Sequence, residues 1–197
     1  MVEIKLQRPD LGGGVSLEKA LAARRSVRTF KGNLLDMRTV FLILWAAQGS
    51  NRSSGFRTCP SAGALYPLET LLVAGNVEGL AAGVYRYIPV RHEIRQTLEK
   101  DIRRELAEAA LGQSMVARAP IVIAITAVYD RTTRKYGERG RRYVHMESGH
   151  AAQNVHLEAV SLNLGTVVVG AFEDDRVKAL LGLERDEHPL ILMPVGD

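Results

Sequence analysis

Apolar residues recur at two different spacings along the chain, and these spacings predict its helices and strands. Behind Ser16, a favourable helix N-cap, apolar residues follow at helical intervals up to Ala23. Asp36 precedes a second helix, which is apolar over most of its circumference and stops before Gly49, so we expect it to be buried. Further helices are predicted over residues 101–111, over 143–164, and from a cap at Asp174 or Asp175 to Leu181.

Runs of β-branched and aromatic residues predict the strands. The run at 121–128 is apolar or small throughout, which is typical of a strand buried on both faces. Other strands are predicted at 69–74, 83–88, 166–169 and 190–195, with looser alternation at 92–98 and a polar loop at 50–60. Because helices and strands mix without strict βαβ alternation, we predict an α+β fold in which helices flank a central sheet and one long helix is buried.

The length of 197 residues, without repeats or linker-like runs, predicts one domain over 1–197 with an N-terminal arm at 1–15. A hydrophobic fraction of 46% and a charged fraction of 24% are those of an ordinary globular protein. One cysteine cannot form an internal disulfide, which excludes a disulfide-stapled secreted scaffold. No apolar stretch is long enough for a signal peptide or a membrane span, so we expect a soluble, cytoplasmic protein.

The net charge of +4 comes from one short segment. Residues 131–142 carry six basic residues and one acid, a local charge of +5, and the rest of the chain sums to −1. We predict a basic loop there on a nearly neutral body, and its simplest interpretation is a solvated loop. A nucleic-acid binder is the least favoured function, because few aromatic residues interleave with the basic ones.

Three segments have compositions suited to a ligand. The RRSVR segment at 24–28 can hold a phosphate by forked hydrogen bonds, although arginine near a helix C-terminus also complements the helix dipole. Small residues between Pro60 and Pro67 let a flat ligand approach the backbone, or they form a tight turn. Small residues at 149–154 and 165–174 suit close packing of a helix against a dimer partner or the sheet.

Motifs of nucleotide, metal and hydrolase chemistry are absent from the sequence. It has no GxGxxG after a strand, no P-loop and no GxSxG elbow. His145, His150 and His156 are five and six residues apart, so one helix face cannot present all three, and we predict no metal site. Cys59 precedes a proline, and we interpret it as a buried or half-exposed side chain rather than a redox centre.

Taken in order, the motifs resemble the nitroreductase superfamily, and within it the SagB-type flavin dehydrogenases. The resemblance covers nearly all of the chain from about Leu17 and is carried by RRSVRTF, CPSAGALYPLE, KYGERGRRYVHMESGHAAQNVHLEAVSLNLGT, VVVGAFEDD and a final PVG. It implies a nitroreductase-like fold with a mostly antiparallel sheet. It also implies an FMN enzyme built as a homodimer, with the long helix and the two flavins at the subunit interface.

The resemblance further implies three groups of residues that contact FMN. Those expected at the phosphate, the ribityl chain or the pyrimidine edge are Arg24, Ser26, Arg28 and, less consistently, Arg25. Those expected to line the flavin from the partner subunit are Pro60, Ser61, Ala62 and Gly63. Those expected near its reactive N5 are Gly170 and Ala171, and the weakest assignment is Asn154.

The end of the sequence departs from the pattern of the superfamily. Its members often carry a Lys or Arg shortly after the terminal PVG, which contacts the phosphate, whereas this sequence ends at Gly196-Asp197. Either the N-terminal arginines suffice, or Arg57 or Arg142 substitutes, or the flavin is held weakly.

Lys135 and Tyr136 form the candidate catalytic pair. In SagB-like enzymes that aromatise azoline rings of modified peptides, a Lys-Tyr pair in this context is the proposed acid/base element, which removes a ring proton while hydride passes to FMN. Neighbouring arginines disfavour a protonated amine, so Lys135 could act as a base. The alternative is that the pair only belongs to the basic loop, which could also guide NADPH.

These observations favour an FMN-dependent oxidoreductase. It would transfer hydride through flavin N5 between NAD(P)H and an organic acceptor such as a nitroaromatic or a quinone. The alternatives are a SagB-type azoline dehydrogenase acting on a modified peptide, and a non-enzymatic flavin-binding protein. The expected partners are a second copy of the chain and a small-molecule or peptide substrate, with no nucleic acid and no membrane.

Overall fold

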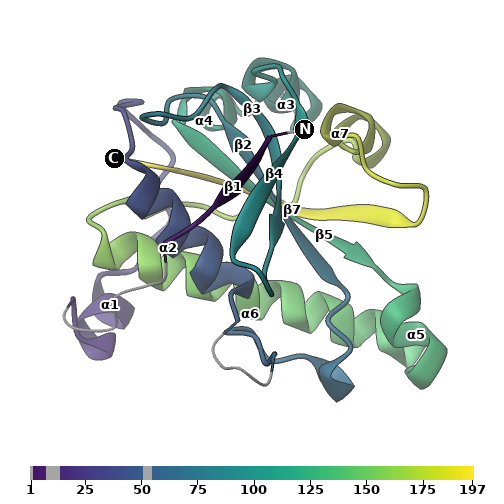
Figure 1. The fold of residues 1–197 in the computed structure, drawn as a ribbon. Coiled ribbons are helices and arrows are strands. Elements are labelled where there is room, and N and C mark those ends of the chain that lie inside the picture. Colours follow the sequence, from purple (N-terminus) through teal and green to yellow (C-terminus); the bar gives the residue numbers. More distant parts are fainter. Residues whose placement is uncertain (1, 8–13, 51–54) are drawn as a thin grey trace.

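The computed structural model describes residues 2–7, 14–50 and 55–197, and its centre is a seven-stranded sheet (Figure 1). The strand order is β1-β4-β3-β2-β5-β7-β6, and every pair of neighbouring strands is antiparallel. The strands are β1 (Glu3–Lys5), β2 (Leu68–Ala74), β3 (Gly83–Ile88), β4 (Glu93–Leu98), β5 (Ile121–Val128), β6 (Gly165–Thr166) and β7 (Glu187–Gly196). The predicted α+β class and antiparallel sheet are confirmed.

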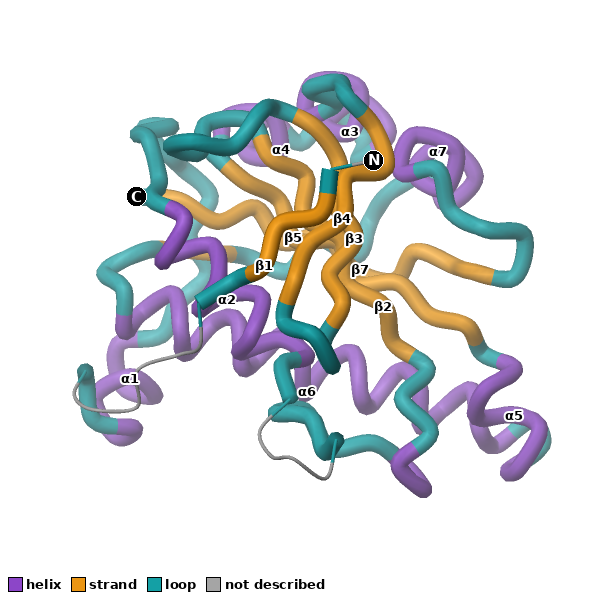
Figure 2. The backbone as a smooth tube through the Cα atoms, in the orientation of Figure 1, coloured by secondary structure: helices purple, strands orange, loops and turns teal. Residues whose placement is uncertain are grey.

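Helices cover both faces of this sheet (Figure 2). The face with the larger apolar cluster packs on α2 (Met37–Gln48) and the long α6 (Arg139–Ser161), and the other face packs on α3 (Arg103–Ala109), α4 (Ser114–Arg118) and α7 (Asp174–Leu181). Two short helices, α1 (Leu17–Ala23) and α5 (Asp130–Tyr136), lie at opposite ends of α6.

The surroundings of the central strand β5 explain why seven of its eight residues are apolar, with Thr126 as the exception. Its residues alternate between the two apolar clusters, so that Ile123 faces α2 and α6 while Ala124 faces the opposite layer. Seven of its eight residues are buried. A strand with helices on both faces needs apolar side chains at odd and even positions alike, as the sequence predicts.

Side-chain caps fix the N-termini of the first two helices, α1 and α2. Ser16 Oγ accepts a hydrogen bond from the Lys19 N–H at 3.4 Å, and Asp36 Oδ1 accepts one from the Thr39 N–H at 2.7 Å. Hydrogen bonds from Thr39 lower the pKa of Asp36. Both predicted caps are confirmed. For α7 the prediction is wrong, because Glu173 holds the N-cap position ahead of Asp174 and makes no side-chain capping bond.

The predicted loop at 131–142 is also wrong. These residues belong to α5 and to the first turn of α6, and the break between them is a short turn at Gly137. The basic segment lacks apolar periodicity, which explains why its helices were not visible in the sequence. The strand predicted at 166–169 is paired as a strand only at 165–166, with one further bridge from Val169 to Leu192. In the part of the chain that the structure describes, no helix has both the length and the apolar character needed to cross a bilayer.

Candidate functional site

A strained turn follows the polar segment between α2 and β2. It contains a single 3-10 turn, η1 (Ala62–Ala64), and three of its residues have left-handed backbones: Gly63 at φ 63°, Ala64 at φ 54° and Tyr66 at φ 47°. Only glycine adopts such angles without cost, and for other residues the cost is about 1–2 kcal/mol each. Strain of this kind persists only where surrounding contacts hold it, and it concentrates at functional sites.

Lys135 and Tyr136, at the end of α5, lie against this turn at Gly63. A Cβ atom added to Gly63 would lie 2.8 Å from Tyr136 Oη and 3.1 Å from Lys135 Nζ. The Tyr136 ring packs edge-on against Tyr143 of α6, with ring centroids 5.2 Å apart, and Lys135 Nζ lies 5.4 Å from the Tyr136 centroid. The structure therefore brings two of the predicted groups together, the Pro60–Gly63 segment and the candidate catalytic pair.

A buried glutamate lies beneath the same turn. Glu147 of α6 is 4% exposed, and its Oε1 accepts a hydrogen bond from the Ala62 N–H at 2.9 Å. Burial raises the pKa of Glu147, and the hydrogen bonds from Ala62 and from the Ser61 side chain oppose the rise only in part. Cys59 is 1% exposed, and its Sγ donates to the Glu147 carbonyl oxygen at 3.4 Å. Burial raises the pKa of this thiol to about 12, so it is a packed thiol rather than a thiolate.

The arginine-rich segment at 24–28 lies beside the edge strand β6. Ser26 forms a parallel bridge with Thr166, and the Val27 N–H donates to the Thr166 carbonyl at 3.0 Å. The contact is close enough to require Gly165, because a Cβ there would lie 2.6 Å from the Val27 side chain. Arg24 also lies near the C-terminal half of α6, at His156. Burial lowers the pKa of His156, and the charge of Arg24 lowers it further.

This edge of the sheet has groups suited to a phosphate and a flat ring. Arg24, Arg25 and Arg28 take part in no ion pair with any residue that the structure describes, so their guanidinium groups are available to an anion. Gly170 and Ala171 are exposed on the segment that leaves the same edge, and a Cβ on Gly170 would meet nothing within 4 Å. The residues present therefore fit the phosphate and ring of a flavin nucleotide.

Within one chain these two groups of residues stay apart. The strained turn meets α6 at Glu147 and the arginine segment meets it near His156, nine residues further along. At 1.5 Å per residue this is about 14 Å along the helix axis. Figure 1 shows the same separation, with α5 near one end of α6 and α1 near the other.

Three other residues named from the sequence have defined places. Asn154 Nδ2 donates to the Ala46 carbonyl at 3.0 Å, which ties α6 to the end of α2. Arg57 donates to Gln48 Oε1 at 2.8 Å and lies over the Tyr66 ring, so its guanidinium is already engaged. Arg142 is exposed and forms no ion pair among the described residues, which leaves it available as the substitute phosphate contact.

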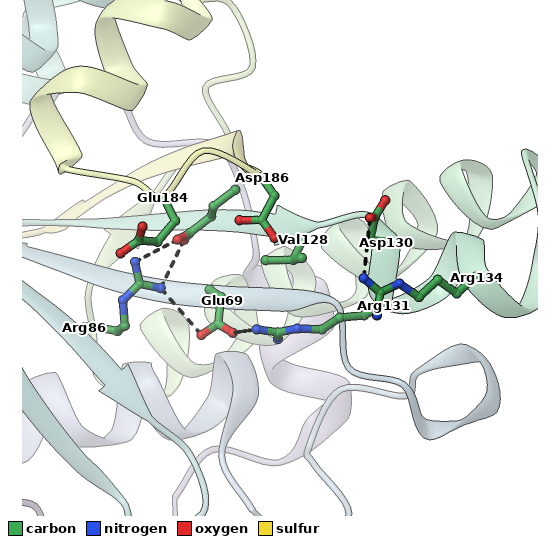
Figure 3. A pocket seen from close by; sticks show the side chains of 9 residues that line it. Glu69, Arg86, Val128, Asp130, Arg131, Arg134, Glu184 and Asp186 are labelled. Atoms are coloured by element: carbon green, nitrogen blue, oxygen red, sulfur yellow. Dashed lines mark hydrogen bonds and ion pairs between the residues drawn. The ribbon is translucent and has the colours of Figure 1, made fainter.

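A charged cavity lies at one end of the sheet, on the face opposite α2 and α6 (Figure 3). Its volume is about 480 Å³, and it is lined by Glu69, Arg86, Val128, Asp130, Arg131, Arg134, Glu184, Asp186 and Glu187. Arg86 binds Glu187 with both nitrogens, at 3.1 and 2.8 Å, and Arg131 binds Glu69 at 2.6 Å. Most charges of this cavity thus have partners within it. Across the described residues, no three His, Cys, Asp or Glu side chains are arranged to hold a metal ion.

The cavity and the strained turn are connected through Arg131. Its Nη1 donates to the Tyr66 carbonyl at 3.1 Å, and Lys135 follows one helical turn later on α5. Residues four apart lie on one face of a helix, so this face of α5 presents two cations to the turn. Neither Arg131 nor Glu69 was named as a site residue from the sequence, because nothing local distinguishes them from other surface charges.

Comparison with known proteins decides the family. The nitroreductase family model matches residues 21–197. The chain belongs to the nitroreductase family. The family predicted from the ordered motifs is therefore confirmed.

Individual relatives of this nitroreductase-family chain agree. It is 51% identical to "Putative nitroreductase MJ1384" of Methanocaldococcus jannaschii, over 98% of this chain and 96% of that protein. A crystal structure of a Ralstonia eutropha nitroreductase-family protein superposes with a TM-score of 0.87 at 29% identity, covering 98% of this chain and 88% of the other. The Escherichia coli Microcin B17-processing protein McbC is 30% identical over 84% of this chain and 63% of its own length. This chain therefore spans less than two thirds of McbC.

Glu147 is the main residue of the candidate site that sequence reasoning missed. It lies three residues after Val144 and four before Ala151, on the buried face of α6. An acid on the apolar face of a predicted helix is a buried polar group that needs a partner, and that signal was present in the sequence.

Proposed function

We propose that the protein is an FMN-dependent oxidoreductase that transfers hydride between NAD(P)H and an organic acceptor such as a nitroaromatic or a quinone. Bound FMN would supply the two-electron chemistry, with its N5 as the hydride-carrying atom. One observation carries the proposal beyond family membership: three guanidinium groups that form no ion pair with a described residue lie at the same edge of the sheet as an exposed, unobstructed backbone segment.

The chain would hold FMN through the two groups of residues that meet α6 near Glu147 and near His156. Arg24, Arg25 and Arg28 would bind the phosphate by charge-assisted hydrogen bonds, with Ser26 between them. Gly170 and Ala171 would present backbone groups to the ring. The residues that would line it from the partner subunit are Pro60, Ser61, Ala62 and Gly63, and Arg142 is a further phosphate candidate.

A homodimer would bring these two groups of residues together. The middle of α6 is exposed at Met146, Gly149 and Gln153, and large apolar residues of α1 are exposed as well, with Leu17 at 60% and Leu21 at 50%. An antiparallel pair of α6 helices would place the strained turn of one subunit beside the arginine segment of the other. This arrangement supports a flavin site shared by two copies of the chain.

Lys135 and Tyr136 would supply proton transfer in this site. Lys135 Nζ and Tyr136 Oη lie at the flavin-lining turn, where they can hold or deliver the proton that accompanies hydride transfer to an acceptor. Binding of NADPH would also draw on Arg139 and Arg142, which form no ion pair among the described residues, because its additional phosphate favours arginine.

A second candidate is a dehydrogenase of azoline rings in a modified peptide. It is favoured by the contact of both Lys135 and Tyr136 with the turn, and by the likeness to McbC, which is described as a peptide-processing protein. A structure of the E. coli microcin synthetase McbBCD complex with truncated pro-MccB17 shares the fold at a TM-score of 0.73. In that reaction Lys135 or Tyr136 would remove the ring proton.

The visible spectrum of the purified protein tests the cofactor, and anaerobic titration with NADH and NADPH tests the donor. We expect flavin bands that bleach with one nicotinamide. A protein without flavin bands even after incubation with FMN contradicts the proposal, and flavin that neither nicotinamide bleaches favours the azoline enzyme or a non-enzymatic flavin carrier.

The variants Lys135→Met and Tyr136→Phe separate the two enzymes. For the reductase, bleaching by nicotinamide should be nearly unchanged in both variants. For the azoline dehydrogenase, oxidation of an azoline peptide should fall by about 10²–10⁴, the usual contribution of general acid–base catalysis.

A further inference from the structure

Glu147 is a buried acid whose hydrogen bonds with described residues come from neutral donors. Its carboxylate accepts from the Ala62 N–H at 2.9 Å and from the Ser61 side chain, and no ion pair joins it to a described cation. The groups whose charges act on it are His150, which lies on the same helix, and Arg57, which lies in the segment before the turn. A buried carboxylate without a cationic partner is costly, and it calls for an explanation beyond packing.

The hydrogen bonds of Glu147 continue into the strained part of the turn. Ser61 Oγ accepts from the Tyr66 N–H at 2.9 Å while its side chain binds Glu147. Tyr66 is one of the two residues other than glycine in this turn that have a left-handed backbone. Glu147, Ser61 and Tyr66 therefore form a chain of contacts that starts in the core helix and ends at the strained residue.

The same turn sets the surroundings of the candidate catalytic pair. Gly63 lies between Ala62, which Glu147 holds, and Ala64, which is strained. Tyr136 Oη and Lys135 Nζ occupy the space that a side chain at position 63 would need, so a shift of the Gly63 backbone would change its spacing from both groups. The position of the pair relative to the flavin-lining segment thus depends on how firmly α6 holds the turn.

We infer that Glu147 is a positioning residue of the active site. It holds the Ser61–Ala62 backbone so that Gly63 keeps Lys135 and Tyr136 at a fixed distance from the flavin-lining segment. This inference rests on the proposed function for the reaction, but the contacts that it invokes belong to the free protein. Glu147 does not touch the reacting groups and acts only through the turn.

The chain contains a reporter for this role. Cys59 is its only cysteine, is 1% exposed, and lies directly before the turn with its thiol on the Glu147 carbonyl. A thiol reagent can modify it only when the turn moves away from α6. The rate of Cys59 labelling in the protein without added flavin therefore measures how tightly the turn is held.

Three variants test the inference. Glu147→Ala removes both acceptors and should accelerate Cys59 labelling at least about tenfold, the factor expected for a lost charge-assisted hydrogen bond. Glu147→Gln keeps one acceptor for the Ala62 N–H and should rescue most of this effect. Glu158→Gln is the matched control, since Glu158 is a half-buried acid of the same helix with a pKa raised by burial, and it should label at the wild-type rate.

Circular dichroism and thermal melting are recorded for each variant, so that a variant that fails to fold is recognised. If Glu147→Ala does not fold, Ser61→Ala takes its place, because it cuts the same chain of contacts one step later. Wild-type labelling rates in a folded Glu147→Ala or Ser61→Ala variant would overturn the inference.

Kinetics with FMN then separate positioning from simple stability. For a positioning role, kcat with an organic acceptor should fall severalfold in Glu147→Ala at unchanged KM for NAD(P)H, with partial recovery in Glu147→Gln. Faster labelling with unchanged kcat would overturn the inference and leave Glu147 a structural residue. Failure of the proposed function is distinguishable, because it appears in the wild type as a protein that binds no flavin.

Discussion

Two buried glutamates, one on each face of the sheet, have contrasting surroundings. Glu187 lies in the charged cavity at the end of the sheet, is 2% exposed, and is matched by Arg86 through two hydrogen bonds. Glu147 lies beneath the strained turn on the opposite face, is 4% exposed, and is bound by a backbone amide and a hydroxyl. Both carboxylates are buried, but only one of them is electrically neutralised.

The presence or absence of an arginine partner separates Glu187, a structural charge, from Glu147, which we infer serves the site. Burial alone would lower the pKa of Arg86, but its hydrogen bond and charge interaction with Glu187 outweigh burial and raise it. Burial raises the pKa of Glu147, and its hydrogen bonds and the charges of His150 and Arg57 oppose the rise only in part. The matched pair joins β3 to β7, whereas the hydrogen bonds of the unmatched acid hold the backbone of the strained turn.

The largest expected effect is on the matched pair. Glu187→Ala leaves the Arg86 guanidinium largely buried without its main partner, and we expect the free energy of unfolding to fall by about 3 kcal/mol. Chemical denaturation measures this value. Glu184→Ala, an exposed acid of the same cavity, is the control and should change stability by less than about 0.5 kcal/mol. Equal losses in the two variants would remove the distinction between Glu187 and an ordinary surface acid.

A smaller effect is expected at the strained turn. Gly63→Ala places a side chain on a left-handed backbone and brings a Cβ to 2.8 Å from Tyr136 Oη. We expect a loss of about 1–2 kcal/mol of stability from the backbone conformation, together with lower turnover from the displaced tyrosine. Gly182→Ala has nearly the same φ of 64° and open space around it, so it should lose similar stability and keep its turnover. Matching turnover in the two variants would disconnect Gly63 from the reaction.

The smallest effect is in the pH dependence of stability. An acid whose pKa is raised on folding stabilises the native state fully below its ordinary value of 4.5, and this contribution is lost as pH rises through the folded pKa. Wild type should therefore lose stability relative to Glu147→Gln as pH increases from about 4.5 towards neutrality. Denaturation curves at several pH values measure the gap between the two proteins. Parallel curves would mean that Glu147 does not titrate in the manner expected for an unmatched acid.

The fold could be predicted further from the sequence than the site. The apolar run of β5 and the capping residues Ser16 and Asp36 are local signals, and the structure confirms each of them. The basic segment at 131–142 has the opposite character. The helix α5 and the start of α6 could not be predicted there, because an arginine-rich segment carries no apolar periodicity.

The site motifs were visible individually, but their grouping was not. The sequence names Gly63 and the Lys135-Tyr136 pair as separate candidates, and the structure places them in contact. It also assigns Glu147 to this group, and it ties α5 to the same turn through Arg131. These contacts join residues far apart in the chain, which no local spacing can predict.

By itself, then, the sequence determined most of the helices and strands and the α+β class, because hydrophobic periodicity and caps are properties of short segments. The ordered motifs identified the family, and the resemblance to that family implied the antiparallel sheet. Only the tertiary structure decided which buried acid is paired with an arginine and which one holds a backbone turn. That distinction depends on the side chains that packing brings around each carboxylate, and packing is set by the whole fold.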